Sequence, residues 1–252
     1  MVTSLRAVWR LLRVTLHALH GVGWVVVGWP LCSAQRQAQL IQWWSYKMLR
    51  LLGVMLTTRG APRPGAALLA INHISWLDIM AIHAVCPQAR FVAKAQVRDW
   101  PLIGRLVSAA GTLYLKRERA RDALRVVHLM AQALQEGQQV AVFPEGTTGP
   151  GWPLLPFHAN LLQAAIATEV PIQPVALKFS DPQHDFSPAV HYLGQTTLAH
   201  SLWRIACARG LRVSVQWLPA MASAHADRRA MAATVQQQIG QALAGNPEGY
   251  SK

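Results

Sequence analysis

From residue 67 onward, short apolar runs alternate with stretches in which apolar residues recur every three or four positions. The runs have the length of buried strands, and the three- to four-residue periodicity is typical of amphipathic helices. Strands that alternate with helices predict an α/β domain whose central sheet is mixed, largely parallel and flanked by helices. The expected strands are 67–71, 89–93, 112–116, 139–143, 172–178, 190–194 and 211–218, and the expected helices are 75–85, 101–110, 121–136, 161–168 and 227 to about 243.

The first 66 residues differ in composition, and we interpret residues 1–66 as a membrane-anchoring helical segment that precedes the α/β domain of residues 67–252. Residues 14–32 hold no Lys, Arg, Asp or Glu and approach the ~20 residues that cross a bilayer. Residues 41–56 predict a helix rich in tryptophan and basic groups, which suits the lipid head-group boundary. We favour two helices that dip into one leaflet. The alternatives are a single crossing by residues 14–32 and an ordinary buried helix at 41–56.

Composition and charge point to an anionic surface as partner. Charged residues make up 14% of the chain, against about 25% in an ordinary soluble domain, and the net charge is +13. Ten tryptophans and a mean hydropathy of +0.19 fit an anionic lipid surface better than nucleic acid. Basic flanks and three cysteines without disulfide or metal spacing predict membrane association at the cytoplasmic face of the inner membrane.

Candidate chemistry begins at INHISWLDI, residues 71–79, where Asp78 is the first acidic residue of the chain. His73 follows an expected strand, and Asp78 falls in the opening turns of the next expected helix. A carboxylate bonded to one imidazole nitrogen fixes the tautomer and raises the basicity of the other nitrogen. Such a pair can act as a general base and its orienter without a nucleophilic Ser or Cys. The H-x4-D spacing alone has little specificity.

The order of the elements brings further candidates to the same place. Ligands of open α/β sheets bind outside the carboxyl ends of the strands. His73, Arg117 and Glu145 each follow an expected strand directly. We therefore expect these three side chains in one crevice.

Four sequence blocks carry a resemblance to a known family. They are NHISWLD (72–78), GTLYLKR (111–117), FPEGTT (143–148) and VPIQPVAL (170–177). In this order and spacing they resemble the motifs of the glycerolipid acyltransferase family, which includes lysophosphatidic acid acyltransferases. The resemblance covers about residues 65–180, and the joint occurrence of four blocks is far more specific than any one of them.

The resemblance implies a membrane-bound enzyme that moves a fatty acyl chain from acyl-carrier protein or acyl-CoA to the free hydroxyl of a lysolipid. His73 would take the hydroxyl proton, Asp78 would hold the imidazole, and backbone N–H groups would stabilise the oxyanion. For Glu145, orienting Arg117 or bonding a hydroxyl is the expected role. The residues implied for binding the acceptor's polar head are Arg117, Glu145, Gly146, Thr147 and Thr148. Further candidates are Asn72, Ser75, Lys94 and Pro171.

No metal-ligand spacing and no nucleotide-binding glycine loop is present, so the sequence predicts no metal and no cofactor besides the thioester co-substrate. Two positions depart from the family pattern. Thr148 stands where an arginine commonly follows EGT, and His158 stands where lysine is frequent. Similar EGTT forms occur in acyltransferases resembling those that make ornithine lipids, whose lyso-acceptor carries an amino-acid head and no phosphate. We rank 1-acyl-glycerol-3-phosphate first because Arg117 is retained, and lyso-ornithine lipid is the alternative.

Two other function classes are weaker. A hydrolase could use Ser75 as nucleophile with His73 and Asp78, but no G-x-S-x-G elbow surrounds Ser75. A non-catalytic basic module would bind nucleic acid or a membrane through its positive charge. The Trp-rich apolar faces argue against nucleic acid.

Overall fold

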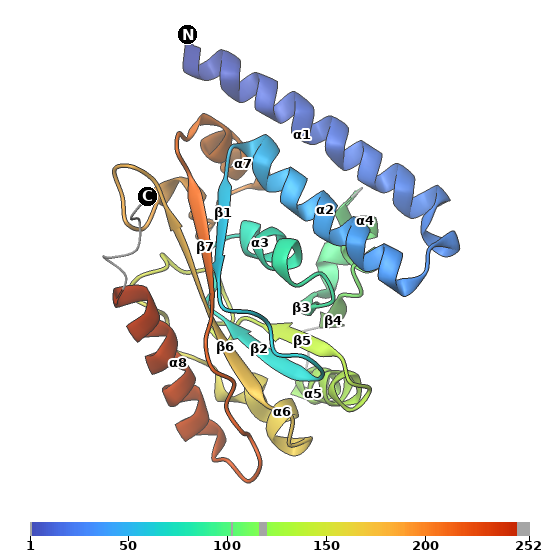
Figure 1. Ribbon diagram of the computed structural model, residues 1–252, viewed down its shortest axis with the longest axis vertical. Helices are drawn as coiled ribbons and strands as arrows, with labels where there is room; N and C mark the ends of the chain where they lie inside the picture. The colour runs from blue at the N-terminus through green and yellow to red at the C-terminus, as the bar shows by residue number, and fades with distance from the viewer. Residues whose placement is uncertain (1, 102, 116–119, 246–252) are drawn as a thin grey trace.

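The computed structural model describes residues 2–101, 103–115 and 120–245 (Figure 1). Its centre is a seven-stranded sheet in the order β1-β7-β6-β2-β5-β3-β4. Strands β6, β2, β5, β3 and β4 run parallel, whereas β7 is antiparallel to β6 and parallel to β1. The strands are β1 Met55–Arg59, β2 Ala67–Ile71, β3 Arg90–Lys94, β4 Leu113–Leu115, β5 Gln139–Val142, β6 Ile172–Ser180 and β7 Arg212–Trp217. The mixed, largely parallel sheet is as the sequence predicts.

Helices cover both faces of this sheet, and each face has its own hydrophobic core (Figure 1). Helices α2, α3 and α7 pack on one face, and α5, α6 and α8 pack on the other. β2 is buried on both faces, since Leu69 and Ile71 join one core while Leu68 and Ala70 join the other. The α-helices are α1 Val2–Val27, α2 Ala34–Leu52, α3 Leu77–Val85, α4 Ile103–Ala109, α5 Ala120–Gln135, α6 Gln163–Ala167, α7 Leu198–Cys207 and α8 Arg228–Ala244. The 3-10 helices are η1 Trp29–Leu31, η2 Ala95–Asp99, η3 Ala159–Leu162 and η4 Pro188–Val190.

One expected strand is wrong. Residues 190–194 form no strand; Val190 is the last residue of η4, and residues 191–194 follow it as irregular backbone. Their carbonyl groups bond side chains in place of a neighbouring strand: Thr148 Oγ1 donates to the carbonyl of Tyr192, and Arg204 donates to that of His191 at 3.4 Å. Two elements were also missed, the edge strand β1 and the helix α7.

The sheet begins earlier than the expected boundary at residue 66. α2 ends at Leu52, and the next residue, Gly53, has a φ of +81° and terminates the helix in the left-handed conformation that glycine favours. The helix expected to continue to residue 56 therefore stops at Leu52, and the chain enters β1, which pairs with β7. Residues 1–66 thus contribute both the helical pair and one strand of the α/β domain.

Polar contacts join α1 to α2 and to the end of α7. His17 Nε2 lies 3.0 Å from the carbonyl of Trp44, and Trp44 Nε1 donates to the carbonyl of His17 at 3.2 Å. At the other end of α1, Arg6 donates to the carbonyl of Cys207 at 2.9 Å. Arg10 donates to the carbonyls of Ala206 and Ala208 at 3.0 and 2.8 Å. These two arginines therefore cap the carboxyl end of α7, where cations are favourable.

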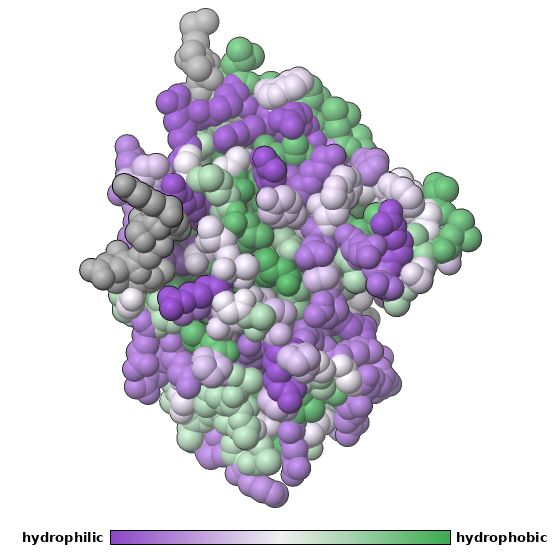
Figure 2. All heavy atoms as spheres, viewed as in Figure 1, coloured by the Kyte–Doolittle hydropathy of each residue, from purple (hydrophilic) through white to green (hydrophobic). Residues whose placement is uncertain are grey.

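The outward side of α1 is apolar, as the green spheres along that helix show (Figure 2). Exposed apolar residues recur at three- and four-residue steps: Leu5, Val8, Trp9, Leu12, Leu16 and Leu19. Exposed apolar stripes of this kind mark contact surfaces for membranes or proteins. Within the described ranges, no helix combines the length and the apolarity needed to cross a membrane.

Candidate active site

The structure brings His73 and Asp78 together at the carboxyl end of β2. His73 Nδ1 lies 2.7 Å from Asp78 Oδ2. The contact forms because β2 ends at Ile71 and α3 starts at Leu77, so that residues 72–76 make a turn and Asp78 reaches back from the first helical turn. The same carboxylate oxygen accepts the N–H groups of Ile74 and Ser75 at 2.7 and 3.0 Å. Asp78 is completely buried, and three donors fix its position.

The imidazole of His73 is held by ring packing as well. It stacks on Phe143 with a centroid distance of 3.8 Å and an interplanar angle of 11°, and Phe143 stacks on Phe91 at 5.5 Å. The His73 side chain retains 18% of its exposure. Because Nδ1 faces the carboxylate, it carries the proton of the neutral ring and leaves a lone pair on Nε2. No residue in the described part of the chain forms a hydrogen bond with Nε2.

Glu145 holds the backbone of His73. Its Oε1 accepts the His73 N–H at 2.7 Å, and its Oε2 accepts the Leu155 N–H at 3.0 Å. The Gly149 N–H donates to the His73 carbonyl at 2.7 Å, so both polar groups of the His73 backbone bond the loop 145–149. Burial raises the pKa of the Glu145 carboxyl. Both carboxylate oxygens thus bond backbone N–H groups, and the expected role of Glu145 in orienting Arg117 or bonding a hydroxyl stays a prediction. Arg117 lies outside the described residues.

The loop after Glu145 is closely packed. Gly146 has a φ of +69°, and a Cβ there would lie 2.9 Å from His158 Cδ2, so the position requires glycine. Thr147 is exposed, and Thr148 Oγ1 donates to the carbonyl of Tyr192. The Thr148 hydroxyl is therefore engaged with the segment that follows η4.

Asn72 and Ser75 lie beside the pair without reaching solvent. Asn72 Nδ2 donates to the carbonyl of Leu177, and Asn72 Oδ1 accepts the Leu177 N–H, both at 2.8 Å. The side chain therefore extends the pairing of β2 with β6 past the end of β2. Ser75 is completely buried, and its Oγ has no hydrogen-bond partner among the described residues. Both residues are buried too deeply to contact a substrate.

The remaining two candidates lie elsewhere. Pro171 precedes β6, and its carbonyl accepts the Leu68 N–H at 3.0 Å, at the amino end of β2. Pro171 is therefore at the amino ends of the parallel strands, whereas His73 is at their carboxyl ends, which corrects the inclusion of Pro171 in the site. Lys94 is the last residue of β3, at the same carboxyl end of the strands as His73, and its side chain is not among those that the structure describes.

Comparison with known proteins agrees with this architecture. Residues 54–178 match the family model described as Acyltransferase. The chain is 36% identical over 183 residues to the 1-acyl-sn-glycerol-3-phosphate acyltransferase of Neisseria gonorrhoeae, an alignment that covers 72% of this chain and 71% of that relative. The chain belongs to the acyltransferase family. It is an enzyme of the 1-acyl-sn-glycerol-3-phosphate acyltransferase type.

Relatives of this acyltransferase include a second acceptor class. This chain is 32% identical over 209 residues to the lyso-ornithine lipid O-acyltransferase of Pseudomonas aeruginosa, and the alignment covers 82% of this chain and 79% of that relative. The crystal structure of the LPA acyltransferase PlsC from Thermotoga maritima has the same fold. It matches with a TM-score of 0.75 at 18% identity over 99% of this chain and 98% of that one.

The acyltransferase also has an apolar cavity that the sequence did not predict. Its volume is about 360 Å³, and residues of α1, α2, α3, α4, α7, β3 and η2 line it. Phe91 lines the cavity and contacts Phe143, the ring that stacks on His73. The cavity therefore lies two aromatic rings away from the imidazole. Its lining includes Val14, Gly21, Trp44, Met80, Ile103 and Leu202.

Proposed function

We propose that the protein transfers a fatty acyl chain from the thioester of acyl-CoA or acyl-carrier protein to the free hydroxyl of a lysolipid. The proposed acceptor is 1-acyl-glycerol-3-phosphate, and the product is then phosphatidic acid. The observation that carries the proposal is the 2.7 Å contact between His73 Nδ1 and Asp78 Oδ2 at the carboxyl edge of an acyltransferase fold.

His73 acts as the general base in this proposal. Its Nε2 removes the hydroxyl proton as the oxygen attacks the thioester carbonyl, and Asp78 stabilises the imidazolium that results. The tetrahedral intermediate collapses with loss of the thiolate, which takes the proton from Nε2. No acyl-enzyme forms on Ser75, because this side chain is completely buried and does not bond His73. The hydrolase alternative is therefore disfavoured.

Glu145 is a positioning residue in the same scheme. It accepts the His73 N–H while Gly149 donates to the His73 carbonyl, so the loop 145–149 fixes the peptide that carries the base. Fixing a general base in reacting geometry lowers the activation barrier because no reorganisation is needed at the moment of transfer.

The apolar cavity is the proposed site for a fatty acyl chain. Helices line it on one face of the sheet, and it begins beside Phe91, which stacks on Phe143 next to His73. Burial of each methylene group contributes about 0.8 kcal/mol, so such a cavity favours a long chain over a short one.

For the acceptor's polar head, the proposed site is the loop with Gly146, Thr147 and Thr148, together with Arg117 as the phosphate ligand that the resemblance implies. Lyso-ornithine lipid is the second candidate acceptor, and one contact favours it. Thr148 stands in the place of a cation and donates its hydroxyl to the carbonyl of Tyr192, so it adds no positive charge for a phosphate. The lyso-ornithine lipid O-acyltransferases among the relatives support the same candidate.

The proposed location is the membrane surface, on its cytoplasmic face. The exposed apolar stripe of α1 suits the boundary between head groups and hydrocarbon, and the net charge of +13 suits an anionic leaflet. Membrane lipid, the lysolipid and the thioester carrier are then the partners, and nucleic acid is not among them.

The test is a direct comparison of acceptors. The purified full-length protein is incubated with acyl-CoA or acyl-carrier protein and either lysophosphatidate or lyso-ornithine lipid, and products are measured by mass spectrometry. We expect phosphatidic acid from the unmodified protein and none from His73→Ala. Ornithine lipid as the sole product would replace the proposed acceptor by the second candidate. Full activity of His73→Ala would overturn the mechanism.

A further inference from the structure

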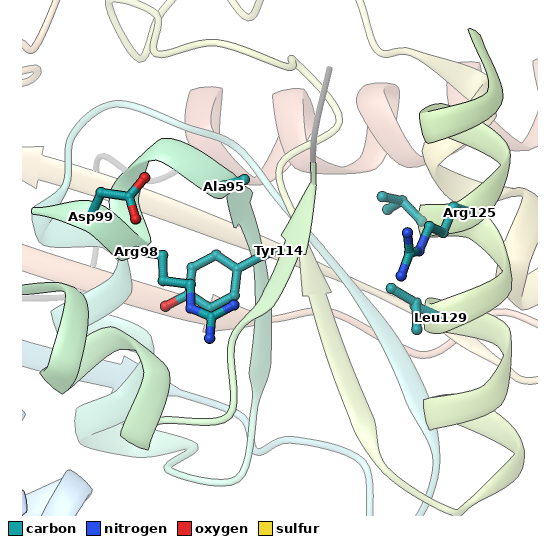
Figure 3. A pocket seen from close by; sticks show the side chains of 7 residues that line it. Ala95, Arg98, Asp99, Tyr114, Arg125 and Leu129 are labelled. Carbon is teal, nitrogen blue, oxygen red and sulfur yellow. The ribbon is translucent and has the colours of Figure 1, made fainter. Parts of the chain in front are cut away.

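A second pocket, of about 510 Å³, lies where β3 and β4 end (Figure 3). Arg98 and Asp99 of η2 line one side, Tyr114 of β4 lies in the middle, and Arg125 and Leu129 extend from α5 toward β4 on the other side. Its polar lining distinguishes it from the apolar cavity, and η2 separates the two because Val97 lines only the apolar one.

The two guanidinium groups of the pocket are not neutralised. Within the described ranges, neither Arg98 nor Arg125 forms a hydrogen bond or ion pair with another residue. Arg98 lies over the Tyr114 ring, 6.0 Å from its centroid, and the Tyr114 hydroxyl is fixed by Ser108 Oγ at 2.7 Å. Among the lining residues that the structure describes, Arg98, Asp99 and Arg125 sum to a net charge of +1. A guanidinium held over an aromatic ring keeps its N–H groups available to an anion. Two oxygens of a phosphate can accept two parallel hydrogen bonds from these N–H groups.

The pocket lies on a line that leads back to His73. By the strand register, Phe91 pairs with Ala141 and Ala93 with Tyr114, so Tyr114 is level with Phe143 and on the same face of the sheet. Arg125 belongs to α5, which packs on the other face, so the pocket extends around the edge strand β4. Three strand spacings separate β2 from β4, which is roughly 14 Å at the usual distance between neighbouring strands. An anion in the pocket beyond β4 is therefore at least about 14 Å from the reacting centre.

We propose that the Arg98–Arg125 pocket binds the phosphate of the phosphopantetheine arm, the group that acyl-CoA and acyl-carrier protein share. The arm places about a dozen bonds between the thioester sulfur and this phosphate, a length comparable to four extended residues or roughly 14 Å. A lysolipid acceptor does not fit the same distance, because only a few bonds separate its free hydroxyl from its head-group phosphate. The pocket therefore binds the phosphate of the donor and not that of the lysolipid. The head group of the acceptor binds at the loop 146–148 in this scheme.

This inference rests on the proposed function, and it is tested through the donor. In the full-length protein, Arg98→Gln and Arg125→Gln each remove one charge from an exposed side chain, so the fold is retained. We expect each variant to raise the KM for acyl-CoA about tenfold with little change in the KM for the lysolipid. With an acyl-pantetheine thioester, which has no phosphate, the variants and the unmodified protein have equal kcat/KM. Arg228→Gln, an exposed arginine on α8, is the matched control.

Two results would overturn the inference while the proposed function stands: a raised KM for the lysolipid in place of the donor, or an equal loss with acyl-pantetheine. Absence of transfer by the unmodified protein would instead overturn the proposed function. In that case equilibrium titration with CoA still tests the pocket. We expect the Arg98→Gln/Arg125→Gln double variant to bind CoA at least tenfold more weakly than Arg228→Gln. Equal affinities of these two proteins would refute the pocket as a phosphate site.

Discussion

Glu145 and His73 are 72 positions apart in the chain, and the carboxylate of the first accepts the backbone N–H of the second at 2.7 Å. The other carboxylate oxygen accepts the Leu155 N–H at 3.0 Å. An acid in the loop after β5 therefore secures the turn after β2, and the two neighbouring parallel strands present one rigid site.

Glu145→Gln is expected to lower kcat by about ten- to hundredfold with little change in either KM. The amide offers oxygen to one of the two N–H donors and turns its NH2 toward the other, so one buried donor loses its partner. Steady-state kinetics with varied donor and acceptor separate kcat from KM. Glu136→Gln makes the same change on an exposed residue of the turn after α5 and serves as the control. A large increase in the acceptor KM at constant kcat would instead make Glu145 a ligand of the head group.

Asp78→Asn is expected to lower kcat by roughly 10²- to 10⁴-fold while the protein remains folded. The neutral amide carries no charge to stabilise an imidazolium. When its NH2 faces His73, it also places a second donor opposite the Nδ1–H, so the hydrogen bond that orients the ring is lost. Turnover is compared with that of Asp185→Asn, a change at an exposed carboxylate, and circular dichroism verifies the fold. Asp78→Asn with normal kcat would remove Asp78 from the mechanism.

Asn72→Asp is expected to lower the free energy of unfolding by about 1–3 kcal/mol at neutral pH. The carboxylate still accepts the Leu177 N–H, but it faces the Leu177 carbonyl without a proton to donate. Chemical denaturation measures the loss. A partial recovery at acidic pH, where the new side chain is protonated, distinguishes the lost hydrogen bond from a packing defect.

His83 is expected to make the fold sensitive to acid. It is buried with Nε2 3.0 Å from the Ala89 carbonyl, and burial lowers its pKa to about 4. The unfolded chain binds a proton near the ordinary pKa of 6.5, so stability is fully present above that pH and falls as the pH drops toward 4. The loss across this window approaches roughly 3 kcal/mol. Denaturation at pH 7 and pH 4.5 measures it, and His83→Gln should flatten the difference. An unchanged slope in that variant would assign the acid sensitivity to other groups.

The sequence predicted the part of the site that is local. ALLAI is a continuous apolar run that ends at a polar turn, and this pattern was sufficient to predict the contact between His73 and Asp78. The partner of Glu145 could not be predicted, because it depends on how the loop 145–149 folds back onto another strand. Likewise, nothing within VHYLG shows that Thr148 and Arg204 bond its carbonyl groups.

The fold was predicted well where strands are buried and poorly at the edge of the sheet. β1 carries mostly exposed residues and follows α2 after a single glycine turn, so its sequence resembled the end of the helix. The cavity was missed for a related reason. Apolar faces of α1 and α2 are visible in the sequence, but their packing over α3 and η2 is a tertiary property.

The hydrogen bonds of Arg10 on α1 begin a series of contacts that leads to the loop with Thr148. Arg10 bonds the end of α7, Arg204 of α7 bonds the carbonyls of Pro188 and His191, and the neighbouring Tyr192 carbonyl receives Thr148. These contacts connect the exposed apolar helix α1 to the loop 145–149 through α7 and the segment after η4. In the proposed arrangement on a membrane surface, the depth and tilt of α1 set the height of the His73 imidazole relative to the hydrocarbon, which suits substrates that remain in the lipid.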